Sequence, residues 1–317
     1  MKKIVVIGSL NMDVVVETPA MPQKGETISG KSISYLPGGK GANQAAAIGK
    51  LGGQVVMIGA VGADASGQAL TKSLTEAGVD SSGIEVLPGL PTGQAFITVD
   101  ENGDNSIIII AGTNGQVSIE MVEQHRKQIE EADIILMQLE IPIDTVCHVK
   151  NMAKQLGKQV IIDPAPAVSE LPKDFWKGVD YIKPNETEIE ILTGRKCSTQ
   201  EEVLLAARSL IDEGVSNVIV SLGSKGCLWV TGQTAEFFAS ERVEAVDTTA
   251  AGDCFIGAFT EALSEERSVQ EAIAFAQRAA AYSVMHKGAQ ASLPLRQELE
   301  ENVVGLEINT KGGFHES

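Results

Sequence analysis

The chain passes from a predicted strand to a predicted helix through Asp247-Thr248-Thr249-Ala250-Ala251-Gly252-Asp253. Arg242 to Val246 alternates apolar and polar residues as a strand does, and apolar residues recur at helical spacing from Cys254 to Leu263. The small side chains of Ala250, Ala251 and Gly252 leave backbone N–H groups uncovered at the helix start. Unpaired donors and the helix dipole both favour an anion there, so the stretch predicts an anion-binding turn.

Asp253 has two interpretations at this position. A carboxylate in the first turn of a helix stabilises the helix by a few tenths to ~1 kcal/mol, which is a purely structural role. Beside an anion-binding turn it also suits a general base, because phosphoryl transfer to a hydroxyl needs positioned charge stabilisation and a proton acceptor. The second interpretation assigns Asp253 and the turn to one catalytic site.

Outward from this turn, predicted strands alternate regularly with predicted helices. The strands are Ile134–Leu139, Val160–Asp163, Tyr181–Lys183 and Val218–Leu222, and the helices are Ile119–Glu131, Pro142–Leu156, Glu186–Leu192, Gln200–Glu213 and Val269 to about Met285. Such alternation predicts an α/β fold, doubly wound, with a mainly parallel sheet and helices on both faces.

Earlier segments do not fit the parallel pattern. Alternating residues at about 13–18, 26–36 and 92–111 predict extra strands, the last as a hairpin around Asn102-Gly103. We predict a small sheet inserted into a single domain of residues 1–317, acting as a lid over the carboxyl ends of the core strands, where such folds bind ligands. Residues 308–317 predict a loose C-terminal tail.

Composition narrows the class of protein. With 43% hydrophobic and 21% charged residues, the chain predicts a folded protein with an aliphatic core. A net charge of −17 argues against nucleic-acid or anionic-membrane partners, and no segment approaches the ~20 apolar residues that span a bilayer. The four cysteines contain no C-x-x-C pair, which argues against structural zinc or disulfides and favours a reducing, cytoplasmic location.

Two motifs near the N-terminus carry polar groups. Gly38-Gly39-Lys40-Gly41-Ala42-Asn43 precedes a predicted helix and lacks the Ser or Thr of a Walker A loop. It fits either a flexible loop that caps the helix or a ligand contact, in which the glycines permit close approach and Lys40 and Asn43 bind. Asn11 and Asp13 follow the first strand and suit a vicinal diol, because a carboxylate accepts two hydroxyl protons while an amide donates and accepts.

Further polar groups follow later strands. Glu140 ends one strand, and alone it fits a helix-start acid. Asn185 and Glu188 fit either a capping-box variant or a hydrated Mg²⁺, which needs few protein ligands. Ser221-Leu222-Gly223-Ser224-Lys225-Gly226 is a second glycine-rich turn, equally suited to a hairpin. Cys254 fits a small core residue. The alternative interpretation is a thiol whose pKa is lowered by its place in the first helical turn and whose modification inhibits the enzyme unless ATP protects it.

Together these motifs resemble, in identity and order, those of the ribokinase-type sugar kinases, also called the phosphofructokinase B family. The similarity runs from Asn11 to Ser292, and the first, second and last motifs are most similar to those of the ribose-phosphorylating members. The resemblance implies ATP-dependent phosphorylation of D-ribose at its 5-hydroxyl. It also implies that the inserted strands form a lid and that the lids of two subunits pair into a homodimer.

The resemblance implies a role for each matching residue. It implies that Asp253 is the base and that the backbone of Ala250, Ala251 and Gly252 stabilises the transferred phosphoryl group. The sugar site would comprise Asn11, Met12, Asp13, Gly39, Lys40, Gly41, Ala42, Asn43, Glu140 and Asp253. The ATP site would comprise Asn185, Ser221, Leu222, Gly223, Ser224, Lys225, Gly226, Gly252, Asp253 and Gln277. Glu188 would organise Mg²⁺ through water, and Asp247, Thr249, Ser283, His286, Gly288 and Ser292 would hold K⁺.

Other functions remain open at this point. A related kinase of 2-keto-3-deoxygluconate, a fructose-type sugar or a nucleoside such as adenosine would share these motifs. A nucleoside calls for aromatic stacking, yet the early strands offer little beyond Tyr35 and Phe96, and a sugar phosphate calls for more basic residues than Lys40 and Lys31. A non-catalytic sugar-binding protein has no need for the base, the anion turn and the magnesium pair together.

Overall fold

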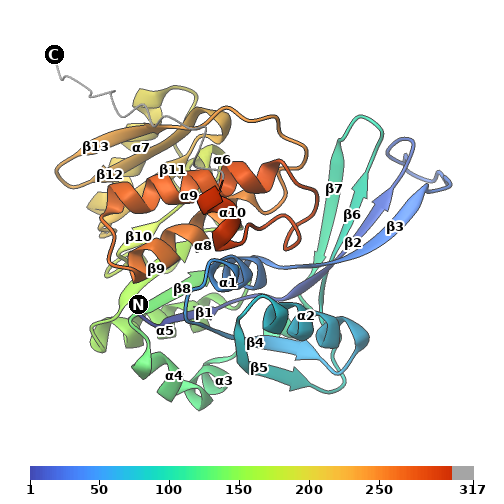
Figure 1. The fold of residues 1–317 in the computed structure, drawn as a ribbon, viewed down its shortest axis with the longest axis horizontal. Helices are drawn as coiled ribbons and strands as arrows, with labels where there is room; N and C mark the ends of the chain where they lie inside the picture. The colour runs from blue at the N-terminus through green and yellow to red at the C-terminus, as the bar shows by residue number, and fades with distance from the viewer. Residues whose placement is uncertain (302–317) are drawn as a thin grey trace.

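The computed structural model describes residues 1–301, so the tail expected at 308–317 lies outside the described residues. A nine-stranded sheet forms the body of the molecule, in the order β13-β12-β11-β10-β9-β8-β1-β4-β5 (Figure 1). Its strands are β1 (Ile4–Ile7), β4 (Val55–Gly62), β5 (Asp80–Leu87), β8 (Ile134–Gln138), β9 (Gln159–Asp163), β10 (Tyr181–Ile182), β11 (Asn217–Ser221), β12 (Gly226–Thr231) and β13 (Ala235–Ala239). Pairs from β11 through to β5 are parallel, whereas β12 pairs antiparallel with both of its neighbours.

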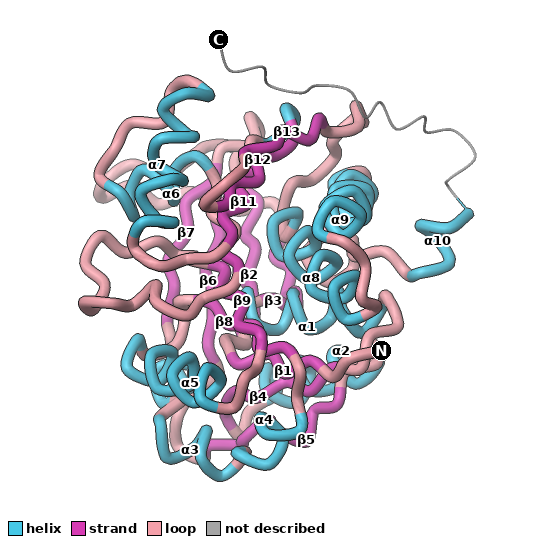
Figure 2. Tube along the Cα trace, turned by 90° about the vertical axis from the view of Figure 1, so that its left-hand side faces the viewer, coloured by secondary structure: helices cyan, strands magenta, loops and turns pink. Residues whose placement is uncertain are grey.

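Helices cover both faces of this sheet (Figure 2). One face packs against α1 (Lys40–Lys50), α2 (Ala65–Glu76), α8 (Ala251–Ser264), α9 (Val269–Val284) and α10 (Arg296–Glu301). The other packs against α3 (Ile119–Gln124), α4 (Arg126–Glu131), α5 (Ile143–Gln155), α6 (Glu186–Thr193) and α7 (Gln200–Asp212). Short 3₁₀ turns lie at η1 (Gly112–Gln116) and η2 (Gly223–Lys225). The predicted doubly wound, mainly parallel fold is confirmed.

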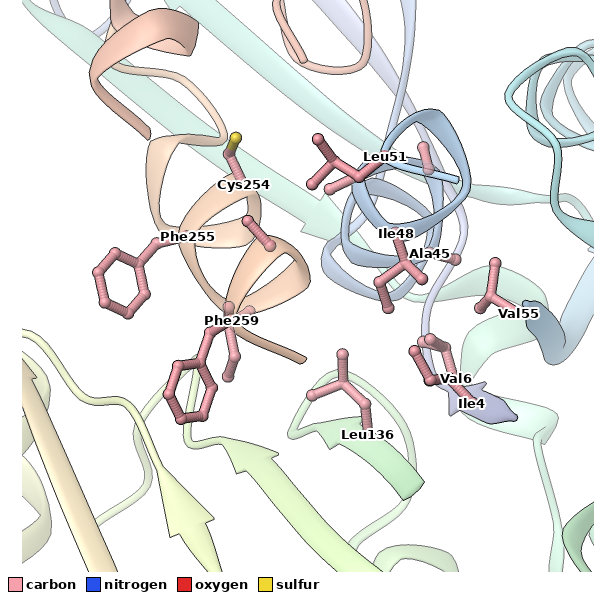
Figure 3. Packing of buried hydrophobic residues seen from close by; sticks show 14 of the residues in the cluster. Ile4, Val6, Ala45, Ile48, Leu51, Val55, Leu136, Cys254, Phe255 and Phe259 are labelled. Atoms are coloured by element: carbon pink, nitrogen blue, oxygen red, sulfur yellow. The ribbon is translucent and has the colours of Figure 1, made fainter. Parts of the chain in front are cut away.

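Two cores result from strands that are buried on both faces. In β1, Ile4 and Val6 enter one core while Val5 and Ile7 enter the other, because successive strand residues point to opposite faces. On the first face α8 packs closely against α1 (Figure 3). Gly257 permits this contact, since a Cβ there would lie 2.6 Å from the Cβ of Ala47. The alanines of α1 and this glycine bring the starts of the two helices together.

A separate four-stranded sheet projects from the body (Figure 1), as the early alternating strands predict. Its order is β3-β2-β6-β7, formed by β2 (Asn11–Glu17), β3 (Ser32–Gly38), β6 (Gly93–Val99) and β7 (Asn105–Ile110). Strand β2 continues from β1 after a short link, and β3 runs directly into α1. The small sheet therefore joins the body beside the polar residues that follow β1.

Several predicted elements differ from the structure. Residues 242–246 form no strand, because they lie outside both sheets and have no strand to pair with; their backbone is held instead by the bond of the Val246 amide to the Val284 carbonyl, 2.7 Å. The predicted helix at 119–131 divides at His125 into α3 and α4. Residues 26–31 precede β3 without being part of it, and β5, which alternation did not reveal, adds an edge strand.

Among residues 1–301, no helix has the length and apolar character needed to cross a membrane.

Candidate active site

The start of α8 has the geometry of an anion-binding turn. Ala250 adopts the left-handed conformation, with φ 60° and ψ 9°, which a residue other than glycine adopts only when its surroundings impose it. Cys254 is the first residue of the helix interior whose amide bonds back along the helix, to the Ala250 carbonyl at 2.8 Å. The Ala251 amide makes only a long bond of 3.3 Å to Thr248, so the amides of this first turn remain available to a ligand.

Asp253 lies in the first turn of α8, and residues of α1 hold its side chain. Its two carboxylate oxygens accept hydrogen bonds from the side-chain amides of Asn43, 3.0 Å, and Gln44, 2.9 Å. The side chain retains 6% exposure and the neighbouring Gly252 is exposed. The carboxylate is therefore oriented by the same helix that begins at the Gly38–Asn43 motif.

The glycines of that motif permit close approach to Asn11 and Asp13. Gly39 has φ 89°, and a Cβ there would lie 2.5 Å from the Asn11 amide nitrogen. A Cβ at Gly38 would lie 2.2 Å from a carboxylate oxygen of Asp13. The structure thus brings both N-terminal motifs together, and a larger residue at either glycine would displace a predicted sugar contact.

Glu140 joins the same cluster from the end of the β8 strand. Its carboxylate accepts a short hydrogen bond from the Ser9 hydroxyl and one of 3.2 Å from the Lys40 amide. Met12, Gly41 and Ala42 are buried around these groups, where Met12 and Ala42 belong to the apolar core. The predicted sugar residues therefore surround one polar site next to Asp253.

Charge is concentrated in this site. Burial, followed by the neighbouring carboxylates of Glu140 and Asp253, raises the pKa of Asp13 to about 7. Burial also raises the pKa of Glu140, although the Ser9 bond and Lys40 oppose the shift. Burial lowers the pKa of Lys40, but Asp253, Asp163, Glu140 and Glu188 together raise it above its usual range. Lys40 is therefore a firmly charged cation within electrostatic reach of both the predicted sugar residues and Glu188.

The predicted nucleotide residues meet at neighbouring strand ends. Asn185 forms an isolated parallel bridge with Ser221, and the Ser221 amide bonds to the Pro184 carbonyl at 2.9 Å. The turn Ser221–Gly226 contains η2 and closes through the bond of the Leu222 amide to the Gly226 carbonyl, 2.8 Å. Gln277 reaches this region from α9 and donates to the Phe238 carbonyl at 3.0 Å. The predicted nucleotide residues therefore lie near one another at the ends of these strands.

Asn185 and Glu188 form both bonds of the capping box at the start of α6. In this structural role one Glu188 oxygen accepts a hydrogen bond from the Asn185 amide at 2.8 Å. The second carboxylate oxygen takes no part in the capping box. Burial raises the pKa of Glu188, Lys183 opposes the shift, and the nearby Asp163 carboxylate adds to it. Asp163 Oδ1 is buried without a hydrogen-bond partner among the described residues. The spare oxygen of Glu188, within electrostatic reach of Asp163, fits a hydrated Mg²⁺.

The residues predicted to hold K⁺ are only partly brought together. Asp247 accepts bonds from the Thr249 amide and the Gly288 amide, each at 2.9 Å, and its own amide bonds to Val284 at 3.1 Å, one residue after Ser283. The His286 ring bonds to the Tyr282 carbonyl and stacks on the Tyr282 ring, and the Ser292 hydroxyl bonds to the Ala289 carbonyl. No group of three or more His, Cys, Asp or Glu residues within 1–301 has the arrangement of a metal site.

Of the two interpretations of Cys254, the small core residue is confirmed and the reactive thiol is wrong. Its thiol is completely buried, and burial, opposed by a hydrogen bond with Ser283, raises its pKa to about 12. Desolvation of the thiolate outweighs the helix dipole at this position. Cys254 is a core residue of α8 whose thiol lies beside Ser283 of α9.

Sequence reasoning missed several polar residues of the site. Gln44 and Asp163 bond to each other at 2.8 Å, Gln138 donates to Gln44 at 2.6 Å, and Lys183 lies 3.6 Å from Asp163. Gln138 and Asp163 end strands β8 and β9, and Lys183 directly follows β10. Their position at the carboxyl ends of parallel strands was the signal that identifies them, since ligands of such folds bind there.

Fold and site together define an α/β enzyme in which a polar cluster and an anion-binding type of turn lie beside one buried carboxylate. The chain belongs to the pfkB family of carbohydrate kinases, whose family model matches residues 1–296.

Individual relatives agree with this assignment. The chain is 41% identical to a ribokinase of Haemophilus influenzae, over 95% of this chain and 98% of the relative. It is 39% identical to a deoxyribokinase of Salmonella typhi, over 94% of this chain and 97% of the relative. Among solved structures, it is similar to Arabidopsis thaliana ribokinase complexed with ribose and ATP, with a TM-score of 0.90, 35% identity and coverage of 95% and 98% of the two chains.

Proposed function

We propose that this protein transfers the γ-phosphoryl group of ATP to the 5-hydroxyl of D-ribose. The observation that carries the proposal is the Asp253 carboxylate, held by Asn43 and Gln44 between the polar cluster and the free amides of the α8 turn. A base next to an anion-binding turn is what phosphoryl transfer to an alcohol requires. The family membership and the relatives named ribokinase support ribose as the acceptor.

The sugar would be held by the groups around Asp13. Asn11 accepts a bond from Asn114 at 2.7 Å, which leaves its own amide N–H groups to donate, and Asp13 offers two acceptor oxygens. Together they suit the vicinal hydroxyls of ribose, with Lys40, Asn43 and Glu140 around them. Asp253 would then take the proton from the attacking hydroxyl, and the amides of Ala250, Ala251 and Gly252 would stabilise the charge on the phosphoryl group.

Mg²⁺ and K⁺ belong to this proposal. Glu188, with its second carboxylate oxygen, would hold Mg²⁺ through water, and the ion would neutralise charge on the phosphates of ATP. Asp247 and Thr249, with groups from Ser283 to Ser292, supply carboxylate, hydroxyl and carbonyl oxygens that suit K⁺. The four cysteines are free thiols, which suits the reducing cytoplasm that we propose as the location.

A substrate panel tests the function. ADP release is followed with Mg-ATP and D-ribose, 2-deoxy-D-ribose, fructose, 2-keto-3-deoxygluconate or adenosine. We expect the highest kcat/KM with ribose. ATP consumption that does not depend on any of these acceptors would contradict a kinase of this class.

Phosphorylation of 2-deoxy-D-ribose is the second candidate function. It is favoured by the relative named deoxyribokinase, whose identity of 39% is close to the 41% of the ribokinase. The pairing of Asn11 with Asp13 favours ribose, because deoxyribose lacks the 2-hydroxyl and would leave one of these buried polar groups unpaired. A higher kcat/KM with 2-deoxy-D-ribose than with ribose would make phosphorylation of deoxyribose the main function.

The ionisation of Asp13 predicts a pH dependence. Because its pKa is about 7 in the free protein, Asp13 gains a proton as the pH falls from 8 to 6 and loses acceptor capacity for the sugar hydroxyls. We expect kcat/KM for ribose to fall over this range, and Asp13→Asn to have a low value that varies less with pH. The pKa of Asp13 is higher in the folded protein than the value of 3.8 in the unfolded chain. Asp13 therefore contributes most to the free energy of unfolding below pH 3.8, and this contribution is lost as the pH rises toward about 7. A wild-type profile that is flat between pH 6 and 8 would contradict the assignment.

Monovalent cations test the site around Asp247. We expect a higher kcat in KCl than in NaCl at equal ionic strength, because a bound K⁺ would support the turn that contains Ala250. Asp247→Asn should abolish most of this difference, whereas Glu244→Gln, an exposed carboxylate of the same segment, should preserve it. Equal wild-type rates in the two salts would count against the K⁺ site.

The small sheet is also the proposed dimer interface. It exposes large apolar side chains on both faces at β7, where Ile107 to Ile110 are 48–64% exposed and Tyr35 on β3 is 63% exposed. One face would close over the sugar and the other would pack on a second copy of this chain. We expect sedimentation of a dimer for the wild type and for Leu205→Glu, an exposed leucine of α7, and of a monomer for Ile108→Glu. A monomeric wild type would refute this interface.

A further inference from the structure

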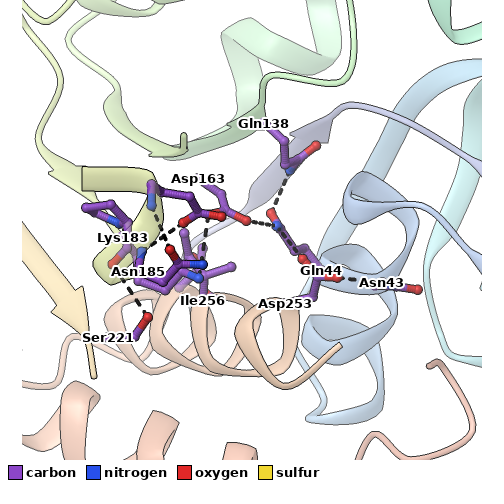
Figure 4. A network of polar contacts seen from close by, with 12 residues as sticks. Asn43, Gln44, Gln138, Asp163, Lys183, Asn185, Ser221, Asp253 and Ile256 are labelled. Carbon is purple, nitrogen blue, oxygen red and sulfur yellow. Dashed lines mark hydrogen bonds and ion pairs between the residues drawn. The ribbon is translucent and has the colours of Figure 1, made fainter. Parts of the chain in front are cut away.

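A buried polar chain joins Asp253 to the opposite side of the anion-binding turn (Figure 4). Gln44 lies at its centre, one turn of α1 beyond Lys40. Its side-chain nitrogen donates to Asp253 Oδ1 at 2.9 Å and to Asp163 Oδ2 at 2.8 Å. The same NH₂ group thus binds two carboxylates that come from different parts of the fold.

The orientation of the Gln44 amide is fully determined. Its oxygen accepts from the Gln138 side-chain amide at 2.6 Å, so both of its N–H groups point toward the carboxylates. Gln44 and Gln138 have 0% exposure, and Asp163 has 1%. Water therefore has little access to these bonds. A 180° rotation of the Gln44 amide would place its oxygen against two carboxylates, which is electrostatically unfavourable.

Two glycines make room for this arrangement. A Cβ at Gly8 would lie 1.9 Å from the Gln138 side-chain oxygen, so only glycine leaves space for that amide beside β1. Gly257 lets α1 approach α8, as described above, and this approach brings Gln44 within reach of Asp253. The packing around the chain is therefore specific to the amide of Gln44.

At its far end the chain reaches Lys183. The Lys183 ammonium is buried, lies 3.6 Å from Asp163 Oδ1, and would be 3.0 Å from a Cβ on Gly252. A separation of 3.6 Å is an electrostatic contact and no hydrogen bond. The ammonium therefore lies beside the amides that are proposed to receive the phosphoryl group, with N–H groups available to it.

We propose that Gln44 is a positioning residue for phosphoryl transfer. It holds the Asp253 carboxylate toward the acceptor hydroxyl and, through Asp163, keeps the Lys183 ammonium beside the anion-binding turn. The base and a phosphoryl-binding cation are thereby set relative to each other by one amide. This inference rests on the proposed kinase function and adds to it a residue that touches neither substrate.

Gln44→Met tests the role, because methionine has nearly the same length and no hydrogen-bonding NH₂ group. Asp253 then keeps only the bond from Asn43. We expect kcat to fall by ~30-fold, while KM for ribose and for Mg-ATP changes by less than about threefold, since misplacing a reacting group by about 1 Å costs up to ~100-fold. Gln138→Met is the matched variant: it makes the same substitution in the same cluster but removes no bond to a carboxylate, and its loss of kcat should be several times smaller.

A second measurement separates positioning from a general structural effect. Gln44 acts partly through Asp253 and partly through Asp163, so adding Gln44→Met to Asp253→Asn should lower the residual kcat by clearly less than the ~30-fold loss expected when Asp253 is present. Gln44→Glu, which keeps the shape and opposes an oxygen to both carboxylates, should lower kcat at least as far as Gln44→Met. It provides the test if the methionine variant does not fold, as judged by circular dichroism and thermal unfolding.

The outcomes distinguish this inference from the function on which it rests. Wild-type protein without sugar-dependent ADP formation contradicts the kinase. A wild type that phosphorylates any sugar of the panel, together with a Gln44 variant whose kcat is within threefold of it, overturns the positioning role. A raised KM with unchanged kcat, or an undiminished loss in the Asp253→Asn background, overturns it equally.

Discussion

Asp253→Asn lowers kcat with ribose and Mg-ATP by at least ~100-fold and leaves ATP binding intact, if Asp253 is the base. The asparagine retains the volume of the side chain but has no anionic oxygen to accept the hydroxyl proton. It also turns an NH₂ group toward one of the donors from Asn43 and Gln44, which bond to the present carboxylate at 3.0 and 2.9 Å. Both effects act on the chemical step and neither touches the nucleotide turn at Ser221–Gly226.

Steady-state kinetics and calorimetric titration with ATP measure the two parts of this expectation. Asp180→Asn is a suitable control, because its carboxylate is also partly buried and accepts a backbone bond, from Val160 at 2.7 Å. Asp180 lies at the amino ends of the strands, away from the site, and its variant should keep the wild-type kcat. A near-normal turnover of Asp253→Asn would remove Asp253 from the role of base.

Lys40→Met is expected to lower kcat/KM for ribose by about 100-fold, which corresponds to ~3 kcal/mol, a loss in the range seen when one partner of a buried charge cluster is removed. The Lys40 ammonium lies close enough to Asp253, Asp163, Glu140 and Glu188 for all four to raise its pKa. Without it, these carboxylates repel one another and the negative charge of the phosphoryl group. Binding of the sugar and transfer of the phosphoryl group should therefore both suffer.

Lys150→Met is the matched control for this variant. Lys40 is half-buried and Lys150 is buried, but Lys150 lies on α5, on the other face of the sheet, where it donates to the Phe175 carbonyl at 2.7 Å. Its replacement should reduce the free energy of unfolding and leave kcat/KM unchanged. If Lys40→Met and Lys150→Met have the same kcat/KM as the wild type, Lys40 has no electrostatic role in the site.

Much of the site could be predicted because its motifs are local. The small residues before Asp253 and the glycines before Lys40 each specify a backbone conformation within a few residues, and the structure shows left-handed Ala250 and positive φ at Gly39 there. Strand and helix periodicity likewise predicted the doubly wound sheet. The capping box of Asn185 and Glu188 was recognisable for the same reason, as a pattern of four consecutive residues.

Predictions that depended on distant partners were less successful. The segment 242–246 has the alternation of a strand, yet a strand exists only where another strand offers hydrogen bonds, and none lies beside it. For Cys254, the alternative of a thiol activated by the dipole of its own helix failed, because tertiary packing buries the thiol completely next to Ser283 of α9 and raises its pKa. In both cases the neighbours in space outweighed the neighbours in sequence.

The sequence by itself determined the class of fold, the conformation of the turn before Asp253 and the choice of Asp253 as the proposed base, since each depends on backbone conformation and side-chain chemistry over short stretches. Only the tertiary structure decided which groups act on Asp253. Gln44, Asp163 and Lys183 come from α1, β9 and the residue after β10, and no spacing along the chain connects them. They meet because parallel strands end at one edge of the sheet and because Gly257 lets two helices come into contact, so the electrostatics of the site arise from packing.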